Sequence, residues 1–340
     1  MKRRRKLFLV LALVALVVSA GCSGGNQGQA PPPAGGEAAP PPHEEAKVIN
    51  IGFTGPLSGG AAFYGKEVAD GLDLAVEEIN AQGITVNGEK YLINLVKLDD
   101  QYMPDKAATN ARRLVEEYRV PAVFVPHSGG IYAIQQFNEE ENLLILGYTS
   151  EPGILERGNR LTMRIPPRYT LYLETFAQMT MERFGNKLGV IPTNTQYGKD
   201  WTEAFVPVWE SMGGVVVAES PIDYNKEADF YTYVSQVLAK EPDVLFVGGP
   251  SQPTAMVIKQ ARELGFQGGF VVMDQAKLDQ MAQIIPMEDL EGAIGSVPLH
   301  LYPSPGTQPF IQRFQAKYDR MPTWEAAYNY QTLWLLAKGI

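Results

Sequence analysis

Short apolar runs alternate with amphipathic stretches along most of this chain, and this alternation restricts the possible folds more than any other feature. Residues 48–54 read as a strand, and after a glycine-rich turn Val68, Leu72, Val76 and Ile79 recur at helical spacing. The pattern predicts further strands at 91–98, 120–125, 143–148 and 162–165, and helices at 105–118 and 131–141. Repeated β-α-β units form a parallel sheet with helices on both faces.

The same alternation restarts after Pro166 and Pro167. Predicted strands lie at 188–191, 215–222, 244–248 and 270–273, and predicted helices lie at 169–184, 199–212, 230–240 and 253–264. A chain of 340 residues exceeds the roughly 100 to 200 residues of one domain. The sequence therefore predicts an α/β protein with two doubly wound parallel-sheet lobes.

The last part of the chain has too few predicted strands for a third domain. A strand at 295–301 precedes helices at 309–318 and 323–339, which we expect to pack on the first lobe. Lobe 1 then comprises residues 48–166 and 300–340, and lobe 2 comprises residues 167–299. Two extended connections between lobes predict a hinge and closure around a ligand.

The N-terminus has the pattern of an export signal. A cationic run at 2–6 precedes twelve apolar residues at 7–18, too few to span a bilayer, and then Ser19, Ala20, Gly21 and Cys22. Small residues before a cysteine resemble the lipobox of bacterial lipoproteins, which implies a signal peptide at 1–22 and lipidation of Cys22. Ser19 stands where that motif usually has Leu or Val, so an ordinary signal peptide with an incidental cysteine stays open.

Residues 23–47 are expected to be a disordered tether. Six Pro and five Gly stand among residues 23–46 with almost no apolar residue beyond Ala, so this segment cannot bury a core. The mature protein would then be exported and held by its lipid on the outer face of the cytoplasmic membrane or in the periplasm.

Composition and motifs exclude several classes of function. The net charge of −9 argues against nucleic acid as a partner, and one cysteine with three histidines predicts neither a disulfide nor a metal site. No G-x-G-x-x-G, G-K-[ST] or G-x-S-x-G motif is present, so we expect no cofactor and no enzyme activity. His127 and Ser128 are adjacent, but neighbouring residues at a strand end point apart and make no nucleophile-base pair.

Several motifs together resemble the leucine/isoleucine/valine-binding protein family. They are residues 49–59, Tyr64-Gly65, residues 75–80, Asp99-Asp100, Met163-Arg164, residues 196–198, Gly248-Gly249 and residues 260–265. These proteins are type I periplasmic solute-binding proteins of ABC transporters, so the resemblance implies a two-lobed monomer and a membrane permease as partner. Because such proteins usually run on for several more elements, the chain is expected to be truncated after Ile340.

Three loops at strand ends of the first lobe predict a ligand site, because ligands of open parallel sheets bind beyond the carboxyl ends of the strands. They are residues 55–60, 127–130 and 148–150, which supply glycines and hydroxyls. Free backbone N–H groups at a helix start, together with hydroxyls, suit a carboxylate. The resemblance implies that the loops with Ser128 and Gly129 and with Tyr148, Thr149 and Ser150 hold the ligand carboxylate, with Ser128, Thr149 and Ser150 as the main candidates and Tyr148 also offering an aromatic ring. Ser and Gly are also ordinary turn residues.

The resemblance also implies residues of the second lobe. Asp274 stands where the family carries an acid for the ligand amino group, although a helix N-cap is an equally good interpretation of this residue. Tyr64 and Tyr197 match aromatic residues near the ligand, and Ser251 follows Pro250, where relatives often have a tyrosine. The predicted ligand is a branched-chain, apolar or aromatic amino acid. A non-amino-acid carboxylate such as an aromatic acid, and a ligand-sensing receptor domain of the same fold, stay open as alternatives.

Overall fold

A computed structural model describes residues 46–340. The predicted signal peptide, Cys22 and nearly all of the tether lie outside these residues. Strand β1 already includes Lys47, one residue before the predicted start of the first lobe. In the described part of the chain, no helix is both long enough and apolar enough to cross a bilayer.

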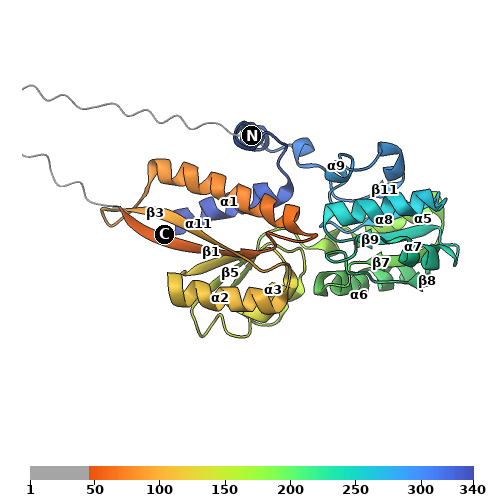
Figure 1. Ribbon diagram of the computed structural model, residues 1–340, viewed down its shortest axis with the longest axis horizontal. Coiled ribbons are helices and arrows are strands. Elements are labelled where there is room, and N and C mark those ends of the chain that lie inside the picture. Colours follow the sequence, from red (N-terminus) through yellow and green to blue (C-terminus); the bar gives the residue numbers. More distant parts are fainter. Residues whose placement is uncertain (1–45) are drawn as a thin grey trace, which may run out of the picture. The chain divides into compact units, whose positions relative to one another are not determined.

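The first sheet has six strands in the order β2-β3-β1-β4-β5-β6, which are parallel except for the antiparallel pair β2 and β3. The strands are β1 (Lys47–Gly55), β2 (Ile84–Val86), β3 (Glu89–Asp99), β4 (Ala122–Val125), β5 (Leu144–Gly147) and β6 (Thr162–Arg164). The helices that follow them are α1 (Ala62–Gln82), α2 (Pro104–Tyr118), α3 (Ser128–Ile134) and α4 (Gly153–Glu156). We call this sheet and its helices the first lobe (Figure 1).

The second sheet has five strands in the order β11-β10-β9-β7-β8, all parallel. The strands are β7 (Lys187–Pro192), β8 (Val215–Glu219), β9 (Val244–Gly248), β10 (Gly269–Val272) and β11 (Ala293–Ile294). Its helices are α5 (Leu173–Phe184), α6 (Gln196–Ser211), α7 (Tyr231–Leu238), α8 (Ser251–Glu263) and α9 (Leu278–Met281), with 3-10 turns η1 (Tyr169–Leu171) and η2 (Met287–Leu290). This sheet and its helices form the second lobe, so the predicted pair of doubly wound lobes is confirmed.

Each sheet is buried on both faces, which explains why its central strands are continuous apolar runs. In the first lobe, Phe53 and Phe124 pack with α1 on one face, and Val123 and Val125 pack with α2 and α3 on the other. In the second lobe, α5 and α6 cover the face that carries Phe246, while α7 and α8 cover the opposite face. The strand ends are therefore the parts of each sheet that remain available to a ligand.

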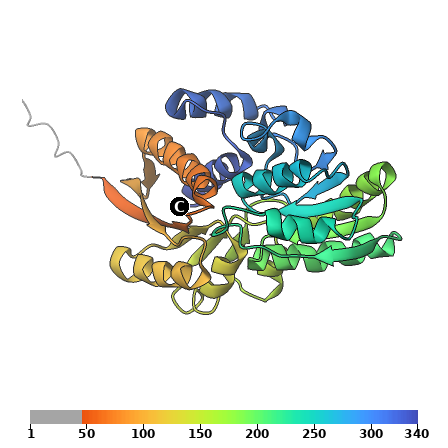
Figure 2. The same cartoon turned by 45° about the vertical axis from the view of Figure 1, so that its right-hand side comes forward.

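The chain passes from the first lobe to the second at Pro166 and Pro167, after β6, and leaves the second sheet after β11. The 3-10 turn η3 (Leu299–Leu301) and helices α10 (Thr307–Tyr318) and α11 (Trp324–Gly339) follow. Leu333 of α11 packs in the core of the first lobe, and Phe314 of α10 packs with Leu74 of α1. Both C-terminal helices therefore lie beside α1 (Figures 1 and 2).

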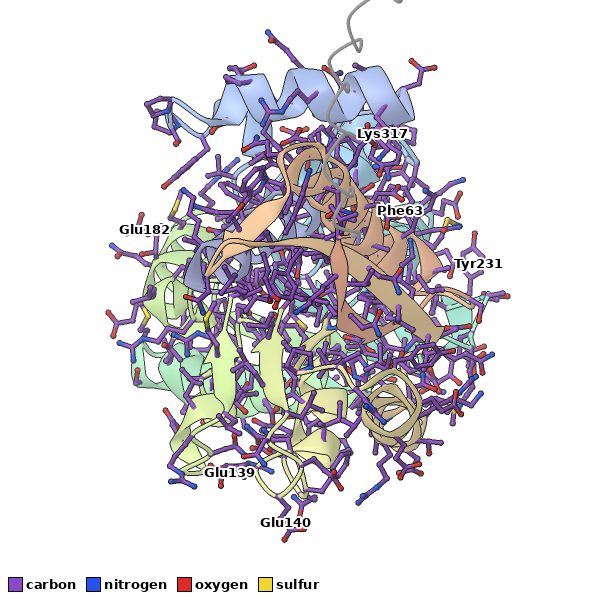
Figure 3. The ribbon with its side chains drawn as sticks, turned by 90° about the vertical axis from the view of Figure 1, so that its left-hand side faces the viewer. Phe63, Glu139, Glu140, Glu182, Tyr231 and Lys317 are labelled. Atoms are coloured by element: carbon purple, nitrogen blue, oxygen red, sulfur yellow. The ribbon has the colours of Figure 1, made fainter. Side chains whose placement is uncertain are left out.

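Two predicted elements are wrong. The strand expected at 295–301 is absent: pairing ends at Ile294, and Pro298 lacks the N–H that a strand needs and instead precedes η3. The helix expected at 131–141 instead spans Ser128–Ile134. It starts at Ser128 because the His127 side chain caps it by accepting a hydrogen bond from Gly130 N. Turns follow, and they leave Glu139 and Glu140 projecting outward (Figure 3).

Candidate functional site

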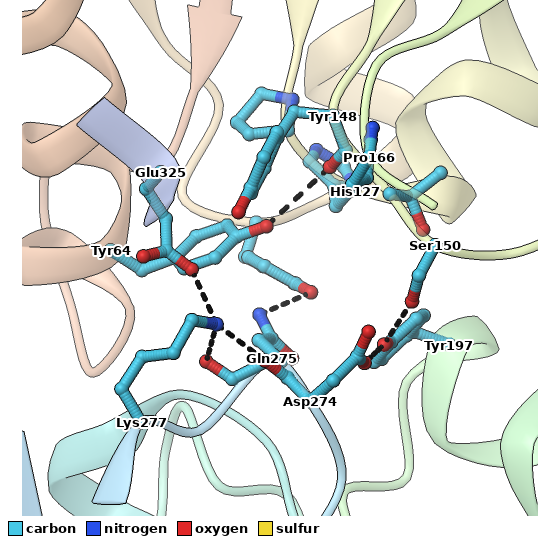
Figure 4. A pocket seen from close by; sticks show the side chains of 13 residues that line it. Tyr64, His127, Tyr148, Ser150, Pro166, Tyr197, Asp274, Gln275, Lys277 and Glu325 are labelled. Carbon is cyan, nitrogen blue, oxygen red and sulfur yellow. Dashed lines mark hydrogen bonds and ion pairs between the residues drawn. The ribbon is translucent and has the colours of Figure 1, made fainter. Parts of the chain in front are cut away.

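A cavity of about 30 Å³ lies between the two lobes, beyond the carboxyl ends of their strands. The first lobe lines it with residues from α1, from α11 and from the loops after β3, β4, β5 and β6, and the second lobe lines it with residues from α6 and the loop after β10 (Figure 4). The lining residues are Tyr64, Tyr102, Pro126, His127, Tyr148, Thr149, Ser150, Pro166, Tyr197, Asp274, Gln275, Lys277 and Glu325. The cavity is small because side chains from the two lobes touch across it.

Tyrosine rings form the wall that the first lobe contributes. Tyr64 packs against Tyr102 and Tyr148, with ring centroids 6.4 and 6.2 Å apart. Burial is the main cause that raises the pKa of all three phenols, so these hydroxyls keep their protons at neutral pH. None of the described residues accepts a hydrogen bond from the hydroxyl of Tyr102 or Tyr148. Both hydroxyls are available as donors.

The backbone that presents Tyr102 is unusual. Gln101 and Tyr102 both have left-handed conformations, with φ of 53° and 63°, which are costly for residues other than glycine. The carboxylates of Asp99 and Asp100 stabilise this turn by accepting hydrogen bonds from Gln101 N (2.9 Å) and Tyr102 N (2.8 Å). The adjacent acids therefore cap a loop that turns an aromatic ring into the cavity.

His127 supports the same ring. Its imidazole stacks on Tyr102 with centroids 4.7 Å apart. Nδ1 accepts a hydrogen bond from Gly130 N, so Nε2 carries the proton and faces Asp100 Oδ2 at 3.0 Å. Ser128 Oγ is buried and has no hydrogen-bond partner among residues 46–340. His127 and Ser128 thus make no nucleophile-base pair.

Asp274 lies at the centre of a donor network in the second lobe. The hydroxyls of Tyr172 and Tyr197 donate to its two carboxylate oxygens, and Trp201 Nε1 approaches Oδ1 at 3.3 Å. Burial and the Asp274 charge raise the pKa of both tyrosines, which keeps them protonated. The next helix begins at Leu278 and has Lys277 at its N-cap, so the alternative interpretation of Asp274 as the N-cap is wrong.

Three polar contacts join the lobes across the cavity. Ser150 Oγ lies 2.8 Å from the Tyr197 hydroxyl, and since Tyr197 gives its proton to Asp274, Ser150 is the donor. Gln275 Nε2 donates to the Tyr102 hydroxyl at 2.9 Å. Lys277 Nζ lies 2.8 Å from Glu325 Oε1, and both side chains are almost fully buried. The structure therefore shows the lobes closed on each other.

The structure brings six of the nine residues predicted for ligand binding to the cavity wall: Tyr64, Tyr148, Thr149, Ser150, Tyr197 and Asp274. Three others lie elsewhere. Ser128 is the fully buried first residue of α3, and Gly129 faces Gln196 at the start of α6. Ser251 braces the loop after β10 by donating to Gln280 Oε1 and accepting from Lys277 N, and it lines a neighbouring pocket.

Sequence reasoning missed Gln275, Lys277 and Glu325. In the sequence, Glu325 is an ordinary acidic residue in the first turn of a helix. It follows Asp274 by 51 positions, so no local motif links the two. The only local signal for Lys277 and Gln275 is their position in the loop that follows β10, next to Asp274. Among residues 46–340, no three acidic, His or Cys side chains gather as a metal site would require.

The fold and this cavity are those of a two-lobed α/β solute-binding protein, with a candidate site between the lobes. A model of the periplasmic binding protein family matches residues 48–340, and the chain belongs to this family, with relatives of the leucine/isoleucine/valine-binding type. Members of the family are substrate-binding proteins rather than enzymes, and the family implies an extracytoplasmic location.

Individual relatives agree with this assignment. An amino acid binding protein of Pseudomonas aeruginosa is 30% identical over 71% of this chain and 64% of its own length. The Leu/Ile/Val-binding protein of Escherichia coli K12 is 24% identical over 80% of this chain and 73% of its own length. The chain thus spans less than two thirds of the first of these relatives and about three quarters of the second.

Solved structures share the fold. The substrate-binding protein LivJ of Streptococcus pneumoniae, in complex with isoleucine, has a TM-score of 0.74 at 24% identity and covers 86% of this chain and 83% of its own. A solute-binding protein of R. palustris in complex with 4-hydroxybenzoate has a TM-score of 0.72 at 18% identity and covers 86% and 80% of the two chains.

Proposed function

We propose that this chain is the extracytoplasmic solute-binding lipoprotein of an ABC importer, and that it binds an amino acid between its two lobes. The observation that carries the proposal is the cavity itself. Hydroxyl donors line its first-lobe wall, whereas the carboxylate of Asp274 lies on the opposite wall. A zwitterion presents a carboxylate and an ammonium group, and therefore matches both walls.

The ligand carboxylate would lie against the first lobe. The Tyr148 and Tyr102 hydroxyls have no acceptor among the described residues, and the Thr149 hydroxyl oxygen accepts only a 3.3 Å bond from Glu151 N. On the opposite wall, Asp274 Oδ2 receives one hydrogen bond, from Tyr172, which leaves room for a ligand N–H. Asp274 would thus meet the α-ammonium group.

Closure of the lobes would be the signal to the membrane permease. The cross-cavity contacts of Ser150 with Tyr197 and of Gln275 with Tyr102 form only when the lobes are closed. A ligand shifts an equilibrium between open and closed forms only through contacts that differ between them. A ligand that first docks on the first-lobe hydroxyls and then meets Asp274 fulfils this condition.

The names of the relatives support an amino acid as the ligand. The relatives are named for binding amino acids in general, or for binding leucine, isoleucine and valine, in two cases together with threonine. The structural relative bound to 4-hydroxybenzoate favours an aromatic carboxylate as the second candidate.

Titration calorimetry and thermal unfolding with the twenty L-amino acids and 4-hydroxybenzoate test the proposal. A ligand at 100 times its Kd adds about 2.7 kcal/mol to the free energy of unfolding, which raises Tm by several degrees. Binding of an amino acid is the expected result. If only 4-hydroxybenzoate binds, the second candidate replaces the first, and if none binds, the proposal fails.

The lipid anchor has its own test. Replacing Cys22 with Ser in a cell that expresses the whole chain removes the thiol that would carry the lipid. We expect the wild-type protein in the membrane fraction and the variant in the soluble fraction. Equal partition of the two proteins would contradict lipidation of Cys22.

A further inference from the structure

The cavity contains two carboxylates, and they differ in how many donors they receive. Asp274 receives hydrogen bonds from Tyr172, Tyr197 and Trp201. Glu325 is 1% exposed, yet neither of its oxygens has an aligned hydrogen-bond donor within the part of the chain that the structure describes. Figure 4 shows these two carboxylates at opposite sides of the cavity, with Tyr197 beside Asp274 and Lys277 beside Glu325.

Lys277 neutralises part of the Glu325 charge but does not saturate the carboxylate. Lys277 Nζ lies 2.8 Å from Oε1 as a close ion pair, without the alignment of a hydrogen bond. Its hydrogen bonds go to the backbone carbonyls of Asp274 and Gln275 in its own loop. Glu325 Oε2 has no partner among the described residues.

The surroundings of Glu325 also contain a hydrogen-bond acceptor without a donor. Gln275 Oε1 is buried in the cavity wall and also has no donor among residues 46–340. The lining residues include no aliphatic side chain other than Pro126 and Pro166, and the remainder are aromatic, hydroxylic, amide or charged. A branched aliphatic group would bury these acceptors without supplying a hydrogen.

A buried carboxylate whose oxygens lack aligned donors is costly, and an ion pair with one ammonium group offsets this cost only in part. The first turn of α11 offsets part of this cost, since a helix N-terminus favours negative charge. Neither oxygen receives a donor from that turn. A ligand that supplies N–H or O–H donors to Glu325 would remove the remaining cost, whereas an apolar ligand would not.

We propose that Glu325 determines ligand specificity, and that the ligand is a polar amino acid whose side chain donates a hydrogen bond to it through a hydroxyl, amide or ammonium group. This inference rests on the proposed function, because it assumes an amino acid in the cavity. It adds that leucine, isoleucine and valine are not the preferred ligands.

Pairs of amino acids with matched shapes test the inference by titration calorimetry on the wild-type chain. Threonine is compared with valine, asparagine with leucine, and lysine with norleucine, so that each pair differs in donors but little in volume. We expect at least one polar member to bind about 10-fold or more tightly than its apolar partner, because a missing donor leaves a buried acceptor unpaired. Tighter binding of the apolar members would overturn the inference.

Two variants test whether the preference for polar ligands depends on the Glu325 carboxylate. Glu325→Gln keeps the shape and removes the charge, so it should reduce the preference for lysine over norleucine about 10-fold or more. Glu325→Met removes both acceptors of this side chain and should reduce the preference about 10-fold or more in every pair in which the wild type prefers the polar member. Glu182→Gln, an exposed acid on α5 (Figure 3), is the charge-matched control and should leave all affinities unchanged. Thermal unfolding of each variant verifies that it folds.

The outcomes separate the two proposals. If polar and apolar members bind equally well, or if Glu325→Gln binds as the wild type does, the specificity inference fails while the proposed function stands. If no member of any pair binds to the folded wild-type chain, the proposed function fails as well.

Discussion

In each lobe, one helix carries a Tyr-Gly pair in its first turn, and the two pairs are packed in the same way. Tyr64-Gly65 lies in the first turn of α1 and Tyr197-Gly198 lies in the first turn of α6. Each tyrosine lines the cavity, while a side chain on either glycine would collide with a carbonyl oxygen, of Pro56 or of Thr193. The glycines let each helix start close to the end of the preceding strand and bring its tyrosine over that end.

The two tyrosines differ in their partners. The Tyr64 hydroxyl reaches only the carbonyl of Tyr148, at 3.5 Å, whereas the Tyr197 hydroxyl donates to Asp274 and accepts from Ser150 and Trp201. The first-lobe ring is thus held mainly by packing, and the second-lobe ring by a charged network. The same motif therefore builds a wall with free donors in one lobe and a wall whose donors are already used in the other.

Removing the centre of the second-lobe network should have the largest effect on binding. Asp274→Ala takes away the acceptor of Tyr172, Tyr197 and Trp201 as well as the group proposed to meet the ligand ammonium. We expect affinity for an amino acid to fall about 100-fold, measured by calorimetry. Asp229→Ala, an exposed acid of the same lobe, is the control. Unchanged affinity in the Asp274 variant would remove Asp274 from the site.

The two glycines should respond alike if the packing arrangement is shared. Gly65→Ala and Gly198→Ala force a methyl group against backbone, so each should lower the free energy of unfolding by about 1 to 3 kcal/mol. Chemical denaturation measures this change. Gly306→Ala meets open space and should change stability little. A large loss in one lobe only would show that the two arrangements are not equivalent.

The tyrosine hydroxyls should respond differently. Tyr197→Phe removes the hydrogen bond to Asp274 and the cross-cavity partner of Ser150, so it should shift the ligand-free protein toward a more open form. Tyr64→Phe loses only a 3.5 Å contact within the first lobe and should leave closure unchanged. Small-angle scattering reports the radius of gyration of both variants. Equal expansion of the two would contradict the difference between the walls.

The smallest expected effect is a pH-dependent change in the free energy of unfolding, and it comes from Glu151 in the loop after β5. Burial raises its pKa, although hydrogen bonds from the Tyr169 hydroxyl (2.5 Å) and Gly153 N (2.8 Å) oppose the shift. A raised pKa means that the folded state holds the proton more tightly than the unfolded state. This contribution to stability is present at acidic pH and is lost as pH rises through the folded-state pKa.

Glu151→Gln has no such titration. Relative to wild type, its free energy of unfolding should therefore increase as pH rises from about 4 to 7, as measured by denaturation at several pH values. Glu156→Gln, a neighbouring exposed acid, serves as the control. A difference that shrinks with rising pH would show that the Glu151 pKa is lowered rather than raised.

Most of the fold was predictable because its central strands are buried on both faces. Runs such as 120–125 and 244–248 are continuous apolar segments, and they became β4 and β9. The failures have local causes. Val297, Leu299 and Leu301 alternate as a strand would, but Pro298 prevents pairing, and a histidine replaces the usual Ser, Thr, Asp or Asn as the cap of α3.

The candidate site was predictable only where it follows strands. Tyr148, Thr149, Ser150 and Asp274 stand directly after β5 and β10, so the rule for parallel sheets locates them. Glu325 belongs to a C-terminal helix whose position is set by distant contacts rather than by its own sequence. Arg320 pairs with Glu67 and Asp70 of α1, and Glu67 also accepts from Thr323 N, just before α11.

That anchoring has a consequence for how the molecule assembles. The second lobe uses one uninterrupted stretch of chain, whereas the first-lobe core needs Leu333 and Phe314 as well as α1. Contacts between segments separated by some 250 residues form slowly, because a long loop must close before they can be made. During synthesis the second lobe can therefore form before α10 and α11 pack on the first. The cavity wall that carries Glu325 is therefore complete only once α11 has packed on α1, so the candidate site depends on these long-range contacts.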